Sequence, residues 1–416
     1  MVFLDLLFIR RLISKLKNTK GPIIQAFYPF SLAILPLTFE ALFLARNGYT
    51  QQLFFMKRIF FLFVLAALTL SANAQTPKQD RIANKLFKEK SELYFKFKIE
   101  NRSEIATFTK LVSIDNVKGN TVFAYANKSQ FLNFLEANKH YQVLTNPSQL
   151  QQVEMMMDHA GNDRTLNLTA YPTYSQYVAM MQNWAATYPS ICTLHNLGTT
   201  TNGHGLYTLK ITDNVNVREY EPQFLYTSTM HGDETAGYID MLYMIDHLLT
   251  NYGTDPRVTS LINTMEIWIN PLANPDGTYI GGDNTVNAAI RNNANNADLN
   301  RNFPDPQDGP HPDGLSWQPE TMAFMGFADT MDFVMSANFH GGAEVYNYPW
   351  DTKALDHPDR TWFVDVGLNY VDTVHAVSPA NYMIDFTTAG FDAPGVTNGF
   401  AWYEVNGGRQ DYMNAF

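Results

Sequence analysis

Cysteine is nearly absent from this sequence of 416 residues. Cys192 is its only cysteine, so the chain cannot form an intrachain disulfide or a cysteine-rich metal site. The thiol lies in the segment Tyr-Pro-Ser-Ile-Cys-Thr-Leu, which is typical of the start of a buried strand. We therefore interpret Cys192 as a structural residue rather than a nucleophile.

Positive charge is also scarce over most of the chain, and neither repeats nor low-complexity tracts are found. Residues 1–74 contain eight Lys and Arg against two Asp and Glu, whereas residues 75–416 contain 21 against 38. The larger part therefore carries a formal net charge of −17, which repels nucleic acid and excludes a nucleic-acid-binding function. An acidic body is compatible with cationic substrates. The length and the 45% hydrophobic content provide core material for two globular domains.

The N-terminal region lacks an apolar run of comfortable membrane-spanning length. Residues 59–70 form a nearly unbroken apolar run of 12 positions, which is too short for a span. They follow Lys57-Arg58 and precede Ala72-Asn73-Ala74, an arrangement that predicts a signal peptide at residues 56–74. The mature chain would begin at Gln75 and be secreted or periplasmic, with no stable membrane span after signal cleavage.

A signal peptide that begins at Met56 leaves residues 1–55 without a role. We interpret these residues as misassigned upstream sequence, with Met56 as the true start. The alternative is a membrane-anchored N-terminus, because residues 30–44 are apolar too. Pro36 and Glu40 weaken that segment as a membrane span.

Residues 81–145 predict a small α/β open sandwich. Strand-like and helix-like segments alternate in it within a short length. The predicted strands are 92–100, 121–125 and 140–144, and the predicted helices are 105–111 and 129–138, with a turn at 116–120. A polar, Met-rich connection at 149–164 separates this unit from the rest.

From Tyr171 onward the segments are longer and predict a mixed, mostly parallel twisted sheet with helices on both faces. The predicted strands are 193–197, 205–211, 223–228, 265–269 and 336–340, and the predicted helices are 174–188, 234–250 and 362–376. In such sheets, functional sites gather at the carboxyl ends of strands. His231 and His340 both stand where an apolar strand ends.

His231 and Glu234, in the stretch His-Gly-Asp-Glu, are candidate metal ligands. His340, followed by two glycines that leave room near the backbone, completes a His/Glu/His set. Two neutral nitrogens and one carboxylate leave a fourth position for water, which is the ligand pattern of catalytic zinc. The alternatives are a helix cap at the first site, made by Asp233 or Thr229, and a hydrogen-bonded core histidine at the second.

Two further segments provide fixed cations. Asn300-Arg301 offers an amide and a forked guanidinium suited to gripping a carboxylate, and Arg291 lies ten residues earlier. Each arginine could instead be an ordinary surface or ion-paired residue. Asn274-Pro275-Asp276-Gly277 is interpreted as a structural turn.

Together these residues resemble a known family. HGDE, NPLANPDG, RNNANNADLNRNFPDP, NFHGG, YPWD and GVTNGFAWYEVNGGRQDY occur in the order seen in zinc metallocarboxypeptidases, and they are more similar to the carboxypeptidase N/E/D branch than to the digestive branch. The resemblance covers residues 165–416 and implies a catalytic domain there. Residues 75–160 resemble a propeptide-type α/β domain with its linker.

The resemblance implies a role for each motif residue. One Zn²⁺ would be bound by His231, Glu234 and His340, while Arg291 would polarise the scissile carbonyl. The residues expected to contact substrate are Asn300 and Arg301 at its terminal carboxylate, the mobile Tyr403 above it, and Asp351 and Gln410 at its side chain. The implied protein is a bacterial exopeptidase that attacks the last peptide bond of peptides or proteins with a zinc-bound water. It would prefer C-terminal Lys or Arg.

The sequence departs from the family pattern in two places. Asp233 stands where the family has arginine or often asparagine. The general-base glutamate is expected about 22 residues after Tyr403, near position 425, beyond Phe416. Glu344 and Glu404 do not stand where the base is expected. We therefore expect this sequence to be a copy that lacks its last core strand and is inactive as written.

Two other functions remain open from the sequence. One is a non-catalytic peptide- or cell-wall-binding protein that uses the same pocket. The other is a zinc hydrolase of γ-glutamyl–diamino acid bonds in wall peptides.

Overall fold

The computed structural model describes residues 77–150, 152–156, 170–379, 381–384 and 391–416. The predicted signal peptide, residues 1–55 and most of the predicted connection at 149–164 lie outside these ranges. The described residues belong to one compact unit, Gln75–Phe416. None of the described helices has both the length and the apolar character needed to cross a membrane.

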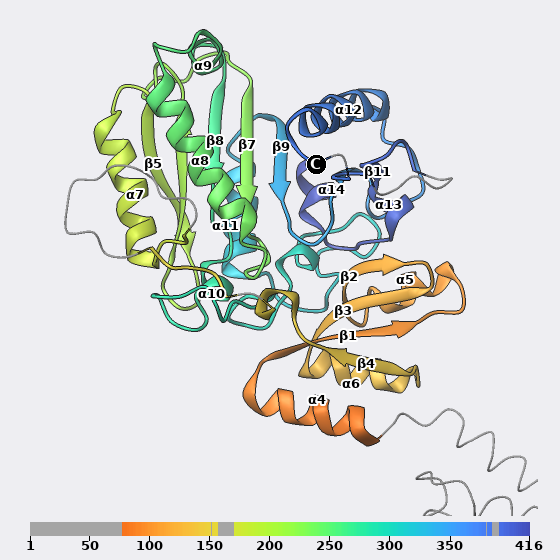
Figure 1. The fold of residues 1–416 in the computed structure, drawn as a ribbon. Helices are drawn as coiled ribbons and strands as arrows, with labels where there is room; N and C mark the ends of the chain where they lie inside the picture. The colour runs from red at the N-terminus through yellow and green to blue at the C-terminus, as the bar shows by residue number, and fades with distance from the viewer. Residues whose placement is uncertain (1–76, 151, 157–169, 380, 385–390) are drawn as a thin grey trace, which may run out of the picture. The chain divides into compact units, whose positions relative to one another are not determined.

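Residues 77–150, called here the N-terminal domain, form an antiparallel sheet of four strands in the order β2-β3-β1-β4. Side chains alternate between the two faces of a strand, so Phe95 and Phe97 of β1 pack beneath helices with Phe131 and Phe134. Tyr94 lies on the opposite face. Figure 1 shows the elements, which are α4 (Pro77–Glu89), β1 (Glu92–Lys98), α5 (Ile105–Phe108), β2 (Ser113–Lys118), β3 (Thr121–Asn127), α6 (Lys128–Glu136) and β4 (Tyr141–Leu144).

Two elements of this domain differ from the sequence prediction. Helix α4 was not predicted, and strand β2 replaces most of what was interpreted as a turn. The apolar residues of β2, Ile114 and Val117, are three positions apart, which breaks the alternation expected of a strand. The pairing of β2 with β3 shifts register between Ile114 and Asn116, so an irregularity in the ladder brings both side chains to buried positions.

Residues 171–416, called here the C-terminal domain, contain the predicted mixed sheet. Its strand order is β5-β6-β8-β7-β9, with antiparallel pairing of β5 to β6 and β6 to β8 and parallel pairing of β7 to both β8 and β9. A parallel bridge joins Ser336 of β9 to Ala415. The strands are β5 (Cys192–Thr199), β6 (Gly205–Ile211), β7 (Gln223–Ser228), β8 (Glu266–Asn270) and β9 (Phe333–Phe339), and a separate parallel pair is formed by β10 (Tyr346–Tyr348) and β11 (Val396–Asn398).

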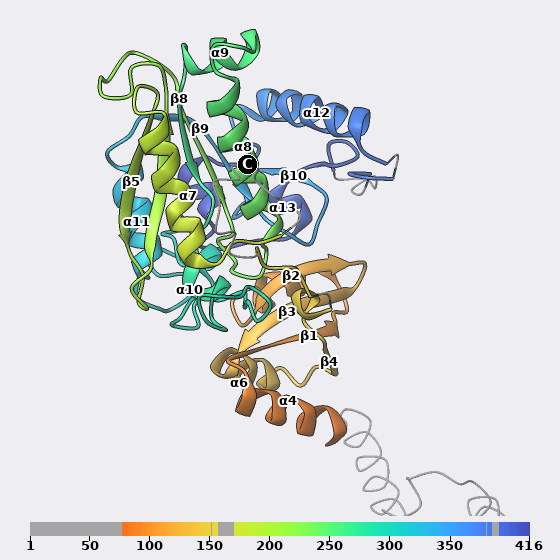
Figure 2. The same ribbon diagram turned by 60° about the vertical axis from the view of Figure 1, so that its left-hand side comes forward.

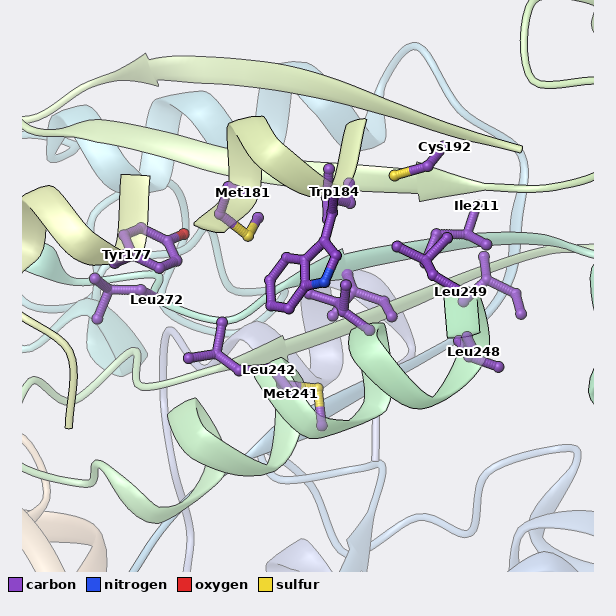
Figure 3. Close-up of a cluster of buried hydrophobic side chains, with 14 of the residues drawn as sticks. Tyr177, Met181, Trp184, Cys192, Ile211, Met241, Leu242, Leu248, Leu249 and Leu272 are labelled. Carbon is purple, nitrogen blue, oxygen red and sulfur yellow. The ribbon is translucent and has the colours of Figure 1, made fainter. Parts of the chain in front are cut away.

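Helices cover both faces of this sheet (Figure 2). The helices are α7 (Tyr174–Thr187), α8 (Ala236–Asn251), α9 (Pro256–Ile262), α10 (Pro275–Thr278), α11 (Pro319–Ala328), α12 (Arg360–Val377), α13 (Gly399–Trp402) and α14 (Arg409–Met413). On one face, α7 and α8 pack over the core of Figure 3. On the other, Phe327 of α11 packs against Trp268 of β8, with ring centroids 5.0 Å apart.

Helix α7 shows how local sequence sets this packing. Thr173 and Gln176 form a reciprocal capping box at its start. Tyr177, Met181 and Trp184 recur at helical spacing and are all buried in the core. Cys192 lies in the same core, where burial raises the pKa of its thiol to about 12. This environment agrees with a structural role for Cys192.

The pairing of β7 with β9 fixes where the candidate ligands meet. The two strands are parallel neighbours, and their last residues, Ser228 and Phe339, are opposite each other. Both strands therefore end at the same edge of the sheet. His231 and His340 follow within three residues of these ends, although 109 positions separate them in the sequence.

Candidate active site

Three side chains converge at this edge as a candidate metal site. The Nδ1 atom of His231 lies 2.8 Å from Oε1 of Glu234, and Nδ1 of His340 lies 2.7 Å from Oε2 of the same carboxylate. The two Nδ1 atoms are 3.1 Å apart. Together the three residues form a group whose ligand atoms all lie within 4.8 Å of one another. His231 is buried, whereas the side chain of His340 is 33% exposed, so the group is open on one side.

Each histidine has a partner for its outer nitrogen. Nε2 of His231 lies 2.9 Å from Oδ1 of Asp298, and Nε2 of His340 lies 2.8 Å from the side-chain amide of Asn338. The Asp298 carboxylate accepts from Nε2–H of His231, which orients that imidazole and leaves its Nδ1 free to ligate. The amide of Asn338 is a donor and positions the ring of His340 without fixing Nδ1 as the free nitrogen. Asp298 and Asn338 were not assigned roles from the sequence. Asp298 stands two residues before Asn300 in a motif already singled out, but its pairing with His231 depends on the fold.

The charges in this group suit a cation. Burial opposes ionisation of Glu234, but His231 and His340 outweigh it and hold the pKa of Glu234 well below its usual range. Burial lowers the pKa of His340, which favours the neutral imidazole that a metal requires. Against burial and the charge of Arg291, the carboxylates of Glu234 and Asp298 raise the pKa of His231 to about 9, so a metal ion has to displace a proton there. The donor set of two imidazole nitrogens and one carboxylate, each in place without rearrangement of the backbone, therefore fits a zinc ion.

Asp298 should matter through His231 rather than by direct contact with a metal. Replacing Asp298 with asparagine keeps the size of the side chain but removes the charge that orients the ring. We expect the zinc affinity of D298N to fall about 10- to 100-fold, measured by competition with a chromogenic chelator. Zinc affinity equal to that of the unchanged protein would contradict this role for Asp298.

The predicted arginines and asparagine lie beside the candidate ligands. Arg291 is 3% exposed, and its Nη1 donates to Oε1 of Glu234 at 3.1 Å while its Nε donates to Oδ2 of Asp298 at 3.1 Å. The side-chain amide of Asn300 lies 3.5 Å from Nε2 of His340. Arg301 donates to the carbonyl of Asn300 at 2.8 Å. The fold therefore brings all three together, in positions from which they could face one substrate.

A cavity of about 320 Å³ opens in front of this cluster. Its lining includes all nine residues that were assigned a metal-binding, catalytic or substrate-binding role from the sequence: His231, Glu234, Arg291, Asn300, Arg301, His340, Asp351, Tyr403 and Gln410. Asp351 is 4% exposed, and Gln410 donates to its Oδ1 at 2.8 Å. A buried carboxylate at the wall of such a cavity is suited to a cationic side chain.

Strand β2 of the N-terminal domain also contacts the site. Arg301 donates from Nη2 to the backbone carbonyl of Ile114 at 3.0 Å, and the hydroxyl of Tyr403 donates to the same carbonyl at 3.4 Å. Ser113 accepts from Nε of Arg291 at 2.8 Å and is hydrogen-bonded to Asp298. These contacts could not be predicted from the sequence, because β2 itself was not predicted.

Glu92 of β1 strengthens this contact between the domains. Its carboxylate is 3% exposed and accepts the backbone N–H groups of Arg291 and Asn292, at 2.9 and 3.2 Å. The guanidinium of Arg291 also lies over the ring of Tyr125, 5.2 Å from its centroid. The N-terminal domain therefore holds Arg291 by both its backbone and its side chain.

Three carboxylates discussed in the sequence analysis, those of Asp233, Glu344 and Glu404, lie in different environments. Burial raises the pKa of Asp233 to about 7, so its charge is reduced at neutral pH. Glu344 lines the cavity and accepts the backbone N–H of Met383 at 2.9 Å. Burial raises the pKa of Glu404, which is absent from the cavity lining. The turn residue Asp276 is buried and bonds to Thr200 and His204, as a structural residue would.

A mixed sheet with helices on both faces and a His/Glu/His group at the carboxyl ends of two parallel strands has the architecture of an α/β protein with a candidate metal site. The model of the zinc carboxypeptidase family matches residues 177–416. The chain therefore belongs to the zinc carboxypeptidase family.

Relatives in this family agree with the branch indicated by the motifs. The chain is 38% identical to carboxypeptidase D of Rattus norvegicus over 240 residues, which are 56% of this chain and 17% of that protein. It is 37% identical to carboxypeptidase M of Mus musculus over 242 residues, 56% of this chain and 54% of that protein. The chain thus spans from about a sixth to about half of the length of these relatives.

Solved structures agree with the fold. The carboxypeptidase A from Helicoverpa armigera superimposes with a TM-score of 0.58 at 19% identity, covering 78% of this chain and 85% of that one. Thrombin activatable fibrinolysis inhibitor superimposes with a TM-score of 0.54 at 16% identity, covering 78% of this chain and 88% of that one. These similarities support the carboxypeptidase fold described above.

Proposed function

We propose that this protein is a zinc-dependent carboxypeptidase that removes the last residue of peptides or proteins and prefers C-terminal Lys or Arg. The observation that carries the proposal is a single cavity lined by His231, Glu234 and His340 together with two arginines. A zinc ion at this site would supply a Lewis acid and an activated water at neutral pH.

The protein's own residues would divide the remaining work. Arg291, beside Glu234, would stabilise the negative charge that develops on the scissile carbonyl oxygen, an effect worth about 3 kcal/mol for one donor. Asn300 and Arg301 would hold the free carboxylate of the substrate. An internal peptide bond offers no carboxylate and would leave Arg301 unpaired, so the enzyme would act only at chain ends. Tyr403, which also lines the cavity, would close over the bound residue.

The activity can be tested on the full product of the gene, loaded with zinc. We expect release of free arginine from a peptide with a C-terminal Arg, and no release after chelation or when the same peptide ends in an amide. Zinc-loaded protein that releases no residue from any such peptide would contradict the proposal. Release only from γ-glutamyl–diamino acid peptides would assign the site to wall peptides instead.

Asp351 is proposed to provide the preference for a basic side chain. Asparagine at this position keeps the shape of the pocket and removes the charge, so the D351N variant should lose about 2–4 kcal/mol, or about 30- to 1000-fold, in kcat/KM for a C-terminal Arg substrate. Cleavage of the matched peptide ending in Leu should change less than about threefold. Asp372, exposed on α12, provides the matched control D372N. Equal losses on both peptides would contradict this role of Asp351.

We also propose that residues 75–160 act as an inhibitory pro-like domain and that residues 56–74 direct export to the periplasm or medium. Support for inhibition comes from the Ile114 carbonyl, which accepts from the Nη2 group of Arg301 that a substrate carboxylate would need.

Support for export comes from the pattern of residues 56–74 alone. Edman sequencing of the protein recovered outside the cytoplasm should begin at Gln75; recovery only from the cytoplasm would contradict export.

A further inference from the structure

Asp411 is a half-buried carboxylate of α14 that the proposed reaction does not use. Its Oδ1 accepts the backbone N–H of Asp351 at 2.7 Å. Its Oδ2 accepts the backbone N–H of Thr352 at 3.1 Å and the hydroxyl of Thr352 at 2.8 Å. Three donors from two consecutive residues therefore converge on one side chain. Helix α14 also supplies Gln410. This one helix therefore holds both the backbone and the side-chain carboxylate of Asp351.

The two aspartates, Asp351 and Asp411, differ in whether they line the cavity. Asp351, Gln410 and Gly399 line it, and Asp411 is absent from that lining. A Cβ atom on Gly399 would lie 1.7 Å from Oδ1 of Asp351, so the space for this carboxylate is closely shaped. Small movements of the 351–352 backbone would therefore displace the carboxylate from the position where it can meet a substrate side chain.

Keeping two carboxylates close together at a buried site is costly. Burial raises the pKa of Asp411, and burial together with the charge of Asp411 raises the pKa of Asp351 well above its usual range. A cation that enters the cavity would offset the charge of both aspartates, which an apolar side chain cannot do.

We propose that Asp411 is a positioning residue for substrate specificity: it clamps the backbone of Asp351 and Thr352 so that the Asp351 carboxylate faces a cationic C-terminal side chain. This inference rests on the proposed carboxypeptidase function and extends it to a residue that does not touch the substrate. It predicts that Asp411 affects the choice between side chains far more than the rate of peptide-bond cleavage.

The test compares two peptides that differ only in a C-terminal Arg or Leu, using the full product of the gene with zinc. In the D411N variant one carboxylate oxygen becomes an amide nitrogen, which cannot accept from an N–H group. We expect the ratio of kcat/KM for Arg over Leu to fall about tenfold or more through a higher KM for the Arg peptide, with kcat changed less than about threefold. Any inhibition by the N-terminal domain cancels in this ratio.

Two further variants make the result decisive. D411A removes all three acceptor contacts and should lower the ratio further, with zinc content and melting temperature showing whether it folds. Asp255 accepts the backbone N–H groups of Arg257 and Val258 in the cap of α9, both at its Oδ1, so D255A removes the same kind of contact elsewhere and should leave the ratio unchanged.

The outcomes separate this inference from the proposed function. If the unchanged protein prefers Arg and D351N loses that preference, but D411N keeps it or loses both activities equally, the positioning role is wrong and the proposed function stands. The positioning role is also wrong if the unchanged protein cleaves both peptides equally well. Cleavage of neither peptide by zinc-loaded protein contradicts the proposed function and this inference with it.

Discussion

Replacing His340 with alanine should remove both the bound zinc and the activity. The variant keeps one imidazole and one carboxylate, which are too few to hold the ion in a catalytic geometry that needs three protein ligands. We expect kcat/KM to fall about a thousandfold or more, because the Lewis acid and the activated water are lost together. Zinc content after gel filtration, measured by atomic emission, should fall from about one ion per chain to nearly none.

The control for this experiment is a histidine on the helix that follows Glu234. His247 is exposed on α8, and its replacement by alanine should leave zinc content and activity unchanged. If H340A retained a full zinc ion, the group of His231, Glu234 and His340 would not be the metal site. Retained zinc with lost activity would instead place His340 among residues that contact the substrate.

Displacing the N-terminal domain should raise activity. In the structure the Ile114 carbonyl engages both Arg301 and Tyr403, so a substrate carboxylate must compete with strand β2 for these groups. Glu92 anchors the domain against Arg291, and lysine at this position would bury a cation beside a cation. Such an unpaired buried charge costs about 3–5 kcal/mol, so E92K should open the interface and increase kcat/KM on the order of 100-fold.

The opening of the interface can be measured separately from activity. Limited proteolysis should cut E92K between the two domains faster than the unchanged protein. Lys98, exposed at the other end of β1, provides the control K98E, which reverses a charge without touching the interface. If E92K opens the interface but loses activity, Glu92 and β1 support the working position of Arg291, and the domain is not inhibitory.

The sequence located most of the long elements of the C-terminal domain because their patterns are local. Strand β7 lies at the predicted positions 223–228, and α7, α8 and α12 differ from prediction by a few residues. Capping pairs and helical spacing of apolar residues act within one or two turns, so they can be read without knowing the fold. Short elements such as α13, α14 and β11 were missed, since a few residues carry too little pattern to distinguish a helix or strand from a loop.

The sequence by itself determined the chemistry: which side chains could bind a metal, grip a carboxylate or receive a cation, together with the family that carries these motifs. Only the tertiary structure decided which of their neighbours act with them. Asp298 meets His231 across 67 positions, Asp411 meets Asp351 across 60, and Ile114 meets Arg301 across 187. The physical reason is that residue type fixes what a group can bind, whereas chain topology fixes which groups lie within a hydrogen bond of each other.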